Sequence, residues 1–95
     1  MKSVKESLVE KIGNKLRIIQ EDYKRKGRLF APGFLWHDTM YMSLRMSPKL
    51  TEEERAVWNE VIEEFIHRGV FCRVKAGIGE ALKLTPEGFG FFGLE

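Results

Sequence analysis

The chain has 95 residues, of which 43% are hydrophobic and 32% are charged, as in an ordinary soluble globular protein. This length predicts one domain, residues 1–95, with a single small core. No apolar run approaches the roughly 18 residues of a membrane span, and the N-terminal residues do not resemble a signal peptide. Cys72 is the only cysteine, which excludes an internal disulfide and favours a cytoplasmic location.

Charge is distributed unevenly along the chain. The net charge of +2 is too small to indicate a nucleic-acid partner by itself. Residues 1–28 hold nine Lys/Arg and four Asp/Glu, a net charge of +5, whereas residues 51–69 hold two and six, a net charge of −4. The N-terminal segment is therefore basic and the central segment acidic.

Residues 1–28 contain a predicted long helix, from 3 to 26. Ser3 and Glu6 have the spacing of a capping box, and Gly27 is a typical helix end. Gly13 is a weak point that allows a kink or a break in the helix. One apolar stripe recurs at helical spacing: Val4, Leu8, Ile12, Leu16, Ile19 and Tyr23.

The end of this helix is strongly basic, with Lys24, Arg25 and Lys26 followed by Arg28 beyond Gly27. Cations at this position complement the negative end of the helix dipole, which is the interpretation we favour. The alternative is a patch that contacts phosphate groups.

Residues 34–46 support two predictions. Met40, Met42, Leu44 and Met46 alternate with polar or aromatic residues, a pattern typical of a strand. Asp38, however, is a suitable helix cap, and methionine and leucine favour helix. We favour a short helix here, which makes residues 34–69 a helix-turn-helix-like segment.

Residues 51–69 contain the clearest predicted helix. Thr51 and Glu54 form a second capping-box pair, and Gly69 can close the helix in the left-handed conformation. The predicted buried face is formed by apolar residues at helical spacing: Val57, Trp58, Val61, Ile62, Phe65 and Ile66.

Residues 70–88 predict a β-hairpin. Alternation from Val70 to Ala76 predicts a half-buried strand with Cys72 on its inward face. The turn is expected at 77–79, and Leu82 and Leu84 face the core on the return strand. Thr85 and Pro86 indicate a capped turn. The aromatic tail, residues 89–95, is too rich in glycine to predict a helix, and its phenylalanines are expected to cover the core or a partner subunit.

These elements indicate a mainly α fold with a small β-hairpin. Their order resembles the winged helix-turn-helix family from about Phe34 to Gly88, with a three-helix core and the hairpin as the wing. The resemblance is carried by the helix that ends in residues 67–71, by the hairpin and by the closing segment from Leu82 to Gly88, which is similar to a frequent strand end of the family.

The resemblance implies binding to double-stranded DNA and a role in transcription regulation. In this family, the second helix of the helix-turn-helix enters the major groove and the wing contacts the backbone. Carried over, residues 51–69 are the recognition helix, yet their six glutamates would repel phosphate. The candidate DNA contacts are the basic and amide side chains of Lys24, Arg25, Lys26, Arg28, Arg45, Lys49, Arg55, Asn59, Arg73, Lys75 and Lys83.

No catalytic or metal site is predicted. His37 and Asp38 lack the spaced ligands of a metal centre, and their expected role is capping and local hydrogen bonding. Cys72 with His67 is a poor nucleophile–base pair because an inward-facing thiol is usually inert packing. Gly77 and Gly79 lack the third glycine of a phosphate-binding loop. We therefore expect neither an enzyme nor a cofactor.

Two functional hypotheses remain. The first is a DNA-binding regulator, with a homodimer formed through the long helix or the aromatic tail. The second is an interaction or structural module without DNA binding, whose acidic helix meets a basic protein partner. Neither hypothesis involves a membrane, because the sequence has no apolar run long enough to span one.

Overall fold

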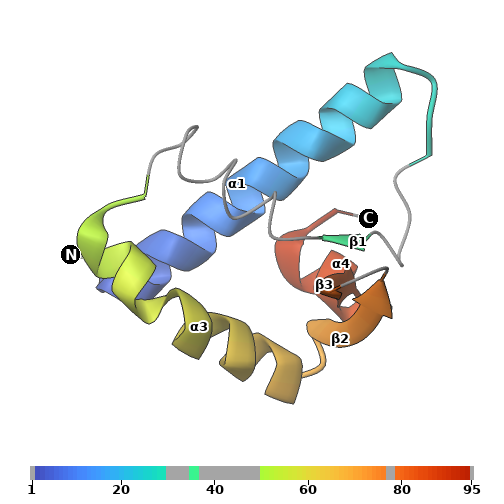
Figure 1. Cartoon of the computed structure of the whole chain (residues 1–95). Coiled ribbons are helices and arrows are strands. Elements are labelled where there is room, and N and C mark those ends of the chain that lie inside the picture. The colour runs from blue at the N-terminus through green and yellow to red at the C-terminus, as the bar shows by residue number, and fades with distance from the viewer. Residues whose placement is uncertain (1, 30–34, 37–49, 77–78, 95) are drawn as a thin grey trace.

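The computed structural model describes residues 2–29, 35–36, 50–76 and 79–94. The elements follow one another along the chain as α1 (Val4–Arg25), β1 (Leu35–Trp36), α3 (Glu52–His67), β2 (Phe71–Ala76), β3 (Gly79–Leu84) and α4 (Pro86–Phe92) (Figure 1). The described part is thus mainly helical, with three helices and an antiparallel hairpin. At this level the predicted fold class is confirmed.

The first predicted helix is confirmed with nearly the expected bounds. Ser3 caps α1 with both hydrogen bonds of the capping box in place, and Gly27 has a φ of 71° just beyond the helix. Gly13 does not break α1. It is buried, and a Cβ atom there would lie 3.3 Å from Cδ1 of Phe92, so this glycine allows α4 to approach the helix.

Within residues 34–46, the structure adds a short strand that the sequence did not predict, just before the helix expected after Asp38. Leu35 and Trp36 form strand β1, paired with Lys83 and Leu82 of β3. The remainder of the segment, including Arg45, Lys49 and the choice between helix and strand at 38–46, lies outside the described residues.

The hairpin is confirmed, and β3 lies between β1 and β2 in one antiparallel sheet. The predicted inward face is wrong at the first strand. Phe71 is 1% exposed, whereas Cys72 is only partly buried. Phe71 pairs with the buried Leu84, and its ring packs 5.7 Å from that of Phe65. Val70 is also buried but precedes the strand, so an alternation counted from Val70 assigns the wrong face.

The aromatic tail is a helix, contrary to the sequence prediction. Thr85 caps α4 through a hydrogen bond from the Gly88 amide, and Gly93 closes it with a φ of 66°. Burial of Phe89 and Phe92 in the core offsets the poor helix propensity of its glycines. These two rings cover the core as expected, while Phe91 remains 42% exposed.

The core lies where α1, α3, the hairpin and α4 meet (Figure 1). Both predicted helical stripes face it, although Val4 of the first stripe is exposed. Within the part of the chain that the structure describes, no helix combines the length and the apolar character needed to cross a membrane. The largest fully buried side chains come from α1, α3 and the hairpin: Leu8, Ile12, Leu16, Val61, Phe71 and Leu84. Helix α4 contributes Phe89 and Phe92, which are 4% and 3% exposed.

We expect replacement of Gly88 by alanine to destabilise the fold. A Cβ atom at this position would overlap the carbonyl oxygen of Val70 and Cδ1 of Leu84. That carbonyl already accepts from the Thr85 amide at 3.2 Å, so it is not free to move. Thermal or chemical denaturation should show a loss of about 1–3 kcal/mol. Glu87→Ala, one residue away and exposed, serves as the control; an equal stability of the two variants would contradict the tight approach.

Candidate functional site

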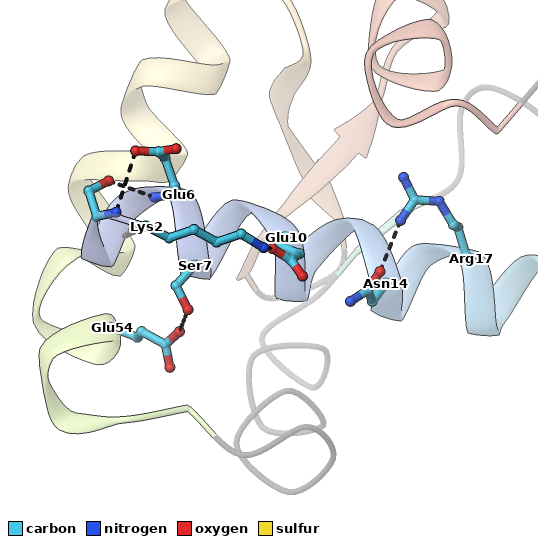
Figure 2. Close-up of polar contacts among 8 residues, drawn as sticks. Lys2, Glu6, Ser7, Glu10, Asn14, Arg17 and Glu54 are labelled. Atoms are coloured by element: carbon cyan, nitrogen blue, oxygen red, sulfur yellow. Dashed lines mark hydrogen bonds and ion pairs between the residues drawn. The ribbon is translucent and has the colours of Figure 1, made fainter.

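The carboxylate of Glu54 joins the start of α3 to α1. Glu54 is 2% exposed and is the third residue of α3. It accepts hydrogen bonds from the Thr51 amide at 2.8 Å, from Oγ of Ser7 at 2.8 Å and from Nζ of Lys11 at 2.6 Å. Figure 2 shows Ser7 and Glu54 pointing toward one another from the two helices. One side chain thus completes the predicted capping box and fixes the helix contact.

These partners decide the ionisation of Glu54. Burial alone would raise its pKa, because the charged form loses hydration. The hydrogen bonds from Lys11, from the Thr51 amide and from Ser7 outweigh that effect and lower the pKa to about 2. The carboxylate is therefore charged at neutral pH, although it is buried.

Other glutamates of α3 pair with cations from elsewhere in the fold. Nζ of Lys5 lies 2.8 Å from Glu60 and 2.9 Å from Glu64, and these hydrogen bonds, led by that to Glu60, raise the pKa of Lys5. Arg73 of β2 pairs with Glu63. Residues 51–69 alone have a net charge of −4, and Lys5, Lys11 and Arg73 reduce the local balance to −1. The acidic helix is largely neutralised within the molecule.

The predicted contacts at the end of α1 form one exposed cluster. Lys24, Arg25, Lys26 and Arg28 are all exposed. The Asp22 carboxylate forms ion pairs with the guanidinium of Arg25 at 3.3 Å and with Nζ of Lys26 at 3.0 Å. The hydrogen bond from Lys26 lowers the pKa of Asp22. The cluster therefore keeps an excess of positive charge.

The structure places the other described candidates elsewhere. On α3, Arg55 lies 3.9 Å from Glu52 and is half-buried, while Asn59 is exposed. The pairing of Arg73 with Leu82 and of Cys72 with Lys83 shows that Lys83 and Arg73 occupy opposite faces of the hairpin.

The candidate residues therefore lie at separate places. The C-terminal end of α1 projects away from α3 (Figure 1), and Lys75 shares the hairpin face of Arg73. Arg45 and Lys49 fall outside the described residues. The predicted DNA contacts do not form a single patch in the described structure.

Sequence reasoning missed a groove between the N-terminal half of α1, the second half of α3 and α4. It has a volume of about 400 Å³. The aromatic tail was the only feature of the sequence that pointed to this groove, because exposed phenylalanines would form an apolar surface patch. The apolar part of the lining comes from three helices: Val9, Val61, Phe65 and Phe91.

Phe91 is the exposed aromatic residue of this groove. Its ring centroid lies 5.3 Å from that of Phe65, and the guanidinium carbon of Arg68 lies 5.1 Å from the Phe91 ring centroid. An arginine over an aromatic face is attracted by the ring quadrupole. The ring is thus held in place while Phe91 remains 42% exposed.

The rim of the groove is charged. Lys2 reaches along α1 and pairs with Glu10, as Figure 2 shows. A second hollow of about 470 Å³ adjoins the groove on α3 and shares Glu64 and Arg68 with it. The two hollows are lined by five carboxylates and by two Lys/Arg side chains: Glu6, Glu10, Glu60, Glu63 and Glu64 against Lys2 and Arg68. Lys5 and Arg73, which pair with Glu60, Glu64 and Glu63, reduce the excess to one negative charge.

The described side chains offer no metal centre, since no three His, Cys, Asp or Glu residues among them gather as ligands. No protein-family model matches the chain, and comparisons with curated proteins and with solved structures find no significant match. Function must therefore be argued from the surface itself.

We expect Glu54→Gln to destabilise the fold at neutral pH by about 3 kcal/mol, because the buried Lys11 ion pair is lost. Glu53→Gln is the matched control, since Glu53 is exposed in the same helical turn. Denaturation of both variants measures the difference. Equal stability would contradict a structural role for the Glu54 carboxylate.

Acidification should remove this difference. The pKa of Glu54 is lowered from 4.5 to about 2 in the folded chain, so its contribution is complete above 4.5 and is lost as the pH falls toward 2. Stability curves of the wild type and Glu54→Gln should therefore converge over this pH range. Curves that stay parallel would show that the lowered pKa does not contribute to stability.

Proposed function

We propose that the chain is a winged helix-turn-helix-like domain that acts as a protein-interaction module. The fold assignment is supported by strand β1, which follows α1 and pairs with β3, and by the hairpin directly after α3. Helix α4 is an addition to the usual order, and residues 37–49, where the remaining helix of the motif would stand, are outside the described part. The assignment therefore rests on sheet order and on the sequence resemblance.

The observation that carries the functional proposal is the groove beside Phe91. Its apolar floor and charged rim are the features of a surface that takes an amphipathic protein segment. A large, half-exposed aromatic ring at the edge of such a groove is a typical binding anchor. The single carboxylate in excess, after the pairs with Lys2, Lys5 and Arg73 are counted, favours a partner that presents Lys or Arg beside an apolar side chain.

Base recognition by α3 is less well supported. Its one arginine, Arg55, pairs with Glu52, and Arg68 at its C-cap lies over the Phe91 ring. Its exposed positions are dominated by glutamates, among them Glu53, whose carboxylate repels phosphate. A helix without a free cation is poorly suited to the major groove.

DNA-backbone binding stands as a second candidate function, favoured by the cluster at the end of α1. Lys24 and Arg28 are exposed there, and neither is part of an ion pair among the described residues. Such a cluster would contact phosphates without selecting a sequence. Transcription regulation would then depend on a further source of specificity.

The interaction proposal predicts that the groove binds a fluorescent amphipathic peptide that carries leucine on one face and lysine on the other. Phe91→Ser should weaken binding at least about tenfold, because it removes the apolar anchor. Ile18→Ser is the control, since Ile18 is exposed on α1 but does not line the groove. Fluorescence anisotropy measures both. No binding, or equal binding to the two variants, would refute the groove as the site.

The DNA alternative predicts binding of a short labelled duplex that weakens steeply between about 50 and 200 mM salt. Replacing Lys24, Arg25 and Lys26 with glutamine should reduce the salt slope by about 3, since each phosphate contact contributes roughly 0.9. Lys15→Gln, on α1 and outside the candidate DNA contacts, is the comparison for a single cation elsewhere. Absence of binding at low salt would exclude this alternative.

A further inference from the structure

We infer that the groove is occupied by the basic end of α1, residues 24–29, from a second copy of this chain. The inference rests on the proposed interaction function and names its partner. It follows from three properties of the molecule: the chemistry of the groove, the chemistry of the basic end, and the distance between them along one helix.

The basic end combines cations with an exposed apolar side chain. Leu29 is 85% exposed, the highest value among the exposed large hydrophobic residues of the described chain. It directly follows Arg28 and the left-handed turn at Gly27, in which the Arg28 amide donates to the Tyr23 carbonyl at 2.8 Å. This turn fixes the position of Leu29 just beyond the helix. An exposed leucine beside four cations is the amphipathic segment that the groove requires.

The groove is complementary in both respects. Val9, Phe65 and Phe91 supply the apolar surface for a leucine. The carboxylates of Glu6 and Glu10 stand on the α1 side of the groove, and that of Glu64 stands on the α3 side. Glu64 shares a single ammonium, that of Lys5, with Glu60, so the pair of carboxylates retains negative charge for an incoming cation.

A chain cannot fill its own groove with this segment. The groove involves residues 2–10, at the N-terminal end of α1, whereas the basic end begins at Lys24, after a continuous helix. At 1.5 Å per residue, the 14 residues from Glu10 to Lys24 span about 21 Å. Figure 1 shows this end of α1 projecting away from α3, which forms the other wall of the groove.

In a dimer with a two-fold axis, the basic end of one copy can reach the groove of the other. If the α1 helices of two copies run antiparallel, the basic end of each copy reaches the groove of the other. Both contacts then form at once, and the assembly closes as a dimer. The inference therefore predicts a dimer with two equivalent salt-dependent contacts instead of an open chain.

The decisive experiment is charge exchange between two variants of the full chain. The first variant reverses the basic end with Lys24→Glu, Arg25→Glu and Lys26→Glu. The second reverses the groove with Glu10→Lys and Glu64→Lys and keeps Glu6, which belongs to the capping box of α1. We expect the wild type to sediment as a dimer that dissociates at high salt, and each variant alone to be monomeric. An equimolar mixture should regain the dimer, because every contact again joins opposite charges.

Two further variants keep the test independent of folding. Leu29→Ser changes an exposed residue and should raise the dimer dissociation constant at least about tenfold while leaving the thermal midpoint of the monomer unchanged. Glu10→Lys alone disturbs only the surface pair with Lys2 and should also weaken the dimer. The double variant Lys75→Glu with Glu87→Lys changes exposed charges outside the interface and should remain dimeric.

A wild type that is monomeric, a mixture that stays monomeric, or a dimer unaffected by Leu29→Ser would each overturn the inference. If the leucine–lysine peptide still binds the wild-type groove in that case, the proposed function stands and only its partner is wrong. If neither peptide binding nor self-association is observed, the proposed function fails as well.

Discussion

The buried carboxylate of Glu54 is the interaction on which the arrangement of α1 and α3 depends. A charge removed from water is stable only when its hydrogen-bonding capacity is filled by suitable partners. Glu54 obtains one partner from its own helix cap and two from α1, namely Ser7 and Lys11. The start of α3 is therefore correctly formed only when α1 lies against it, and local capping is coupled to tertiary packing.

The same coupling explains why charge is segregated along the sequence. The basic N-terminal segment and the acidic central segment meet in the fold, where Lys5 and Lys11 face the glutamates of α3. The sequence suggests that the glutamates of α3 form an acidic surface for an external partner. In the fold, most of them are instead paired within the molecule. The net charges of separate segments thus describe the folded surface poorly. The charge that remains for a partner is the charge not paired within the molecule.

Local signals predicted the helix boundaries well. The caps at Ser3 and Thr51 depend on residues within one turn, so they are visible in the sequence and agree with the structure. Helix α4 was missed because Phe89 and Phe92 stabilise it from the core, against its glycine content. The groove was missed for a related reason: Val9, Phe65 and Phe91 belong to three helices, and no local pattern brings them together.

After the internal pairs are removed, the two most distinctive surfaces are the apolar groove beside Phe91, with one carboxylate in excess on its rim, and the basic end of α1. The continuous helix α1 separates them. Binding to DNA and binding to a second copy both use the basic end of α1, so the two functions depend on each other. The cations that would contact DNA are the same ones that would enter the groove of a second copy, and one lysine cannot do both. If both binding modes exist, duplex DNA competes with dimer formation, so the DNA-bound form is the monomer. A regulator built in this way would store its phosphate-binding surface in the dimer and expose it on dissociation.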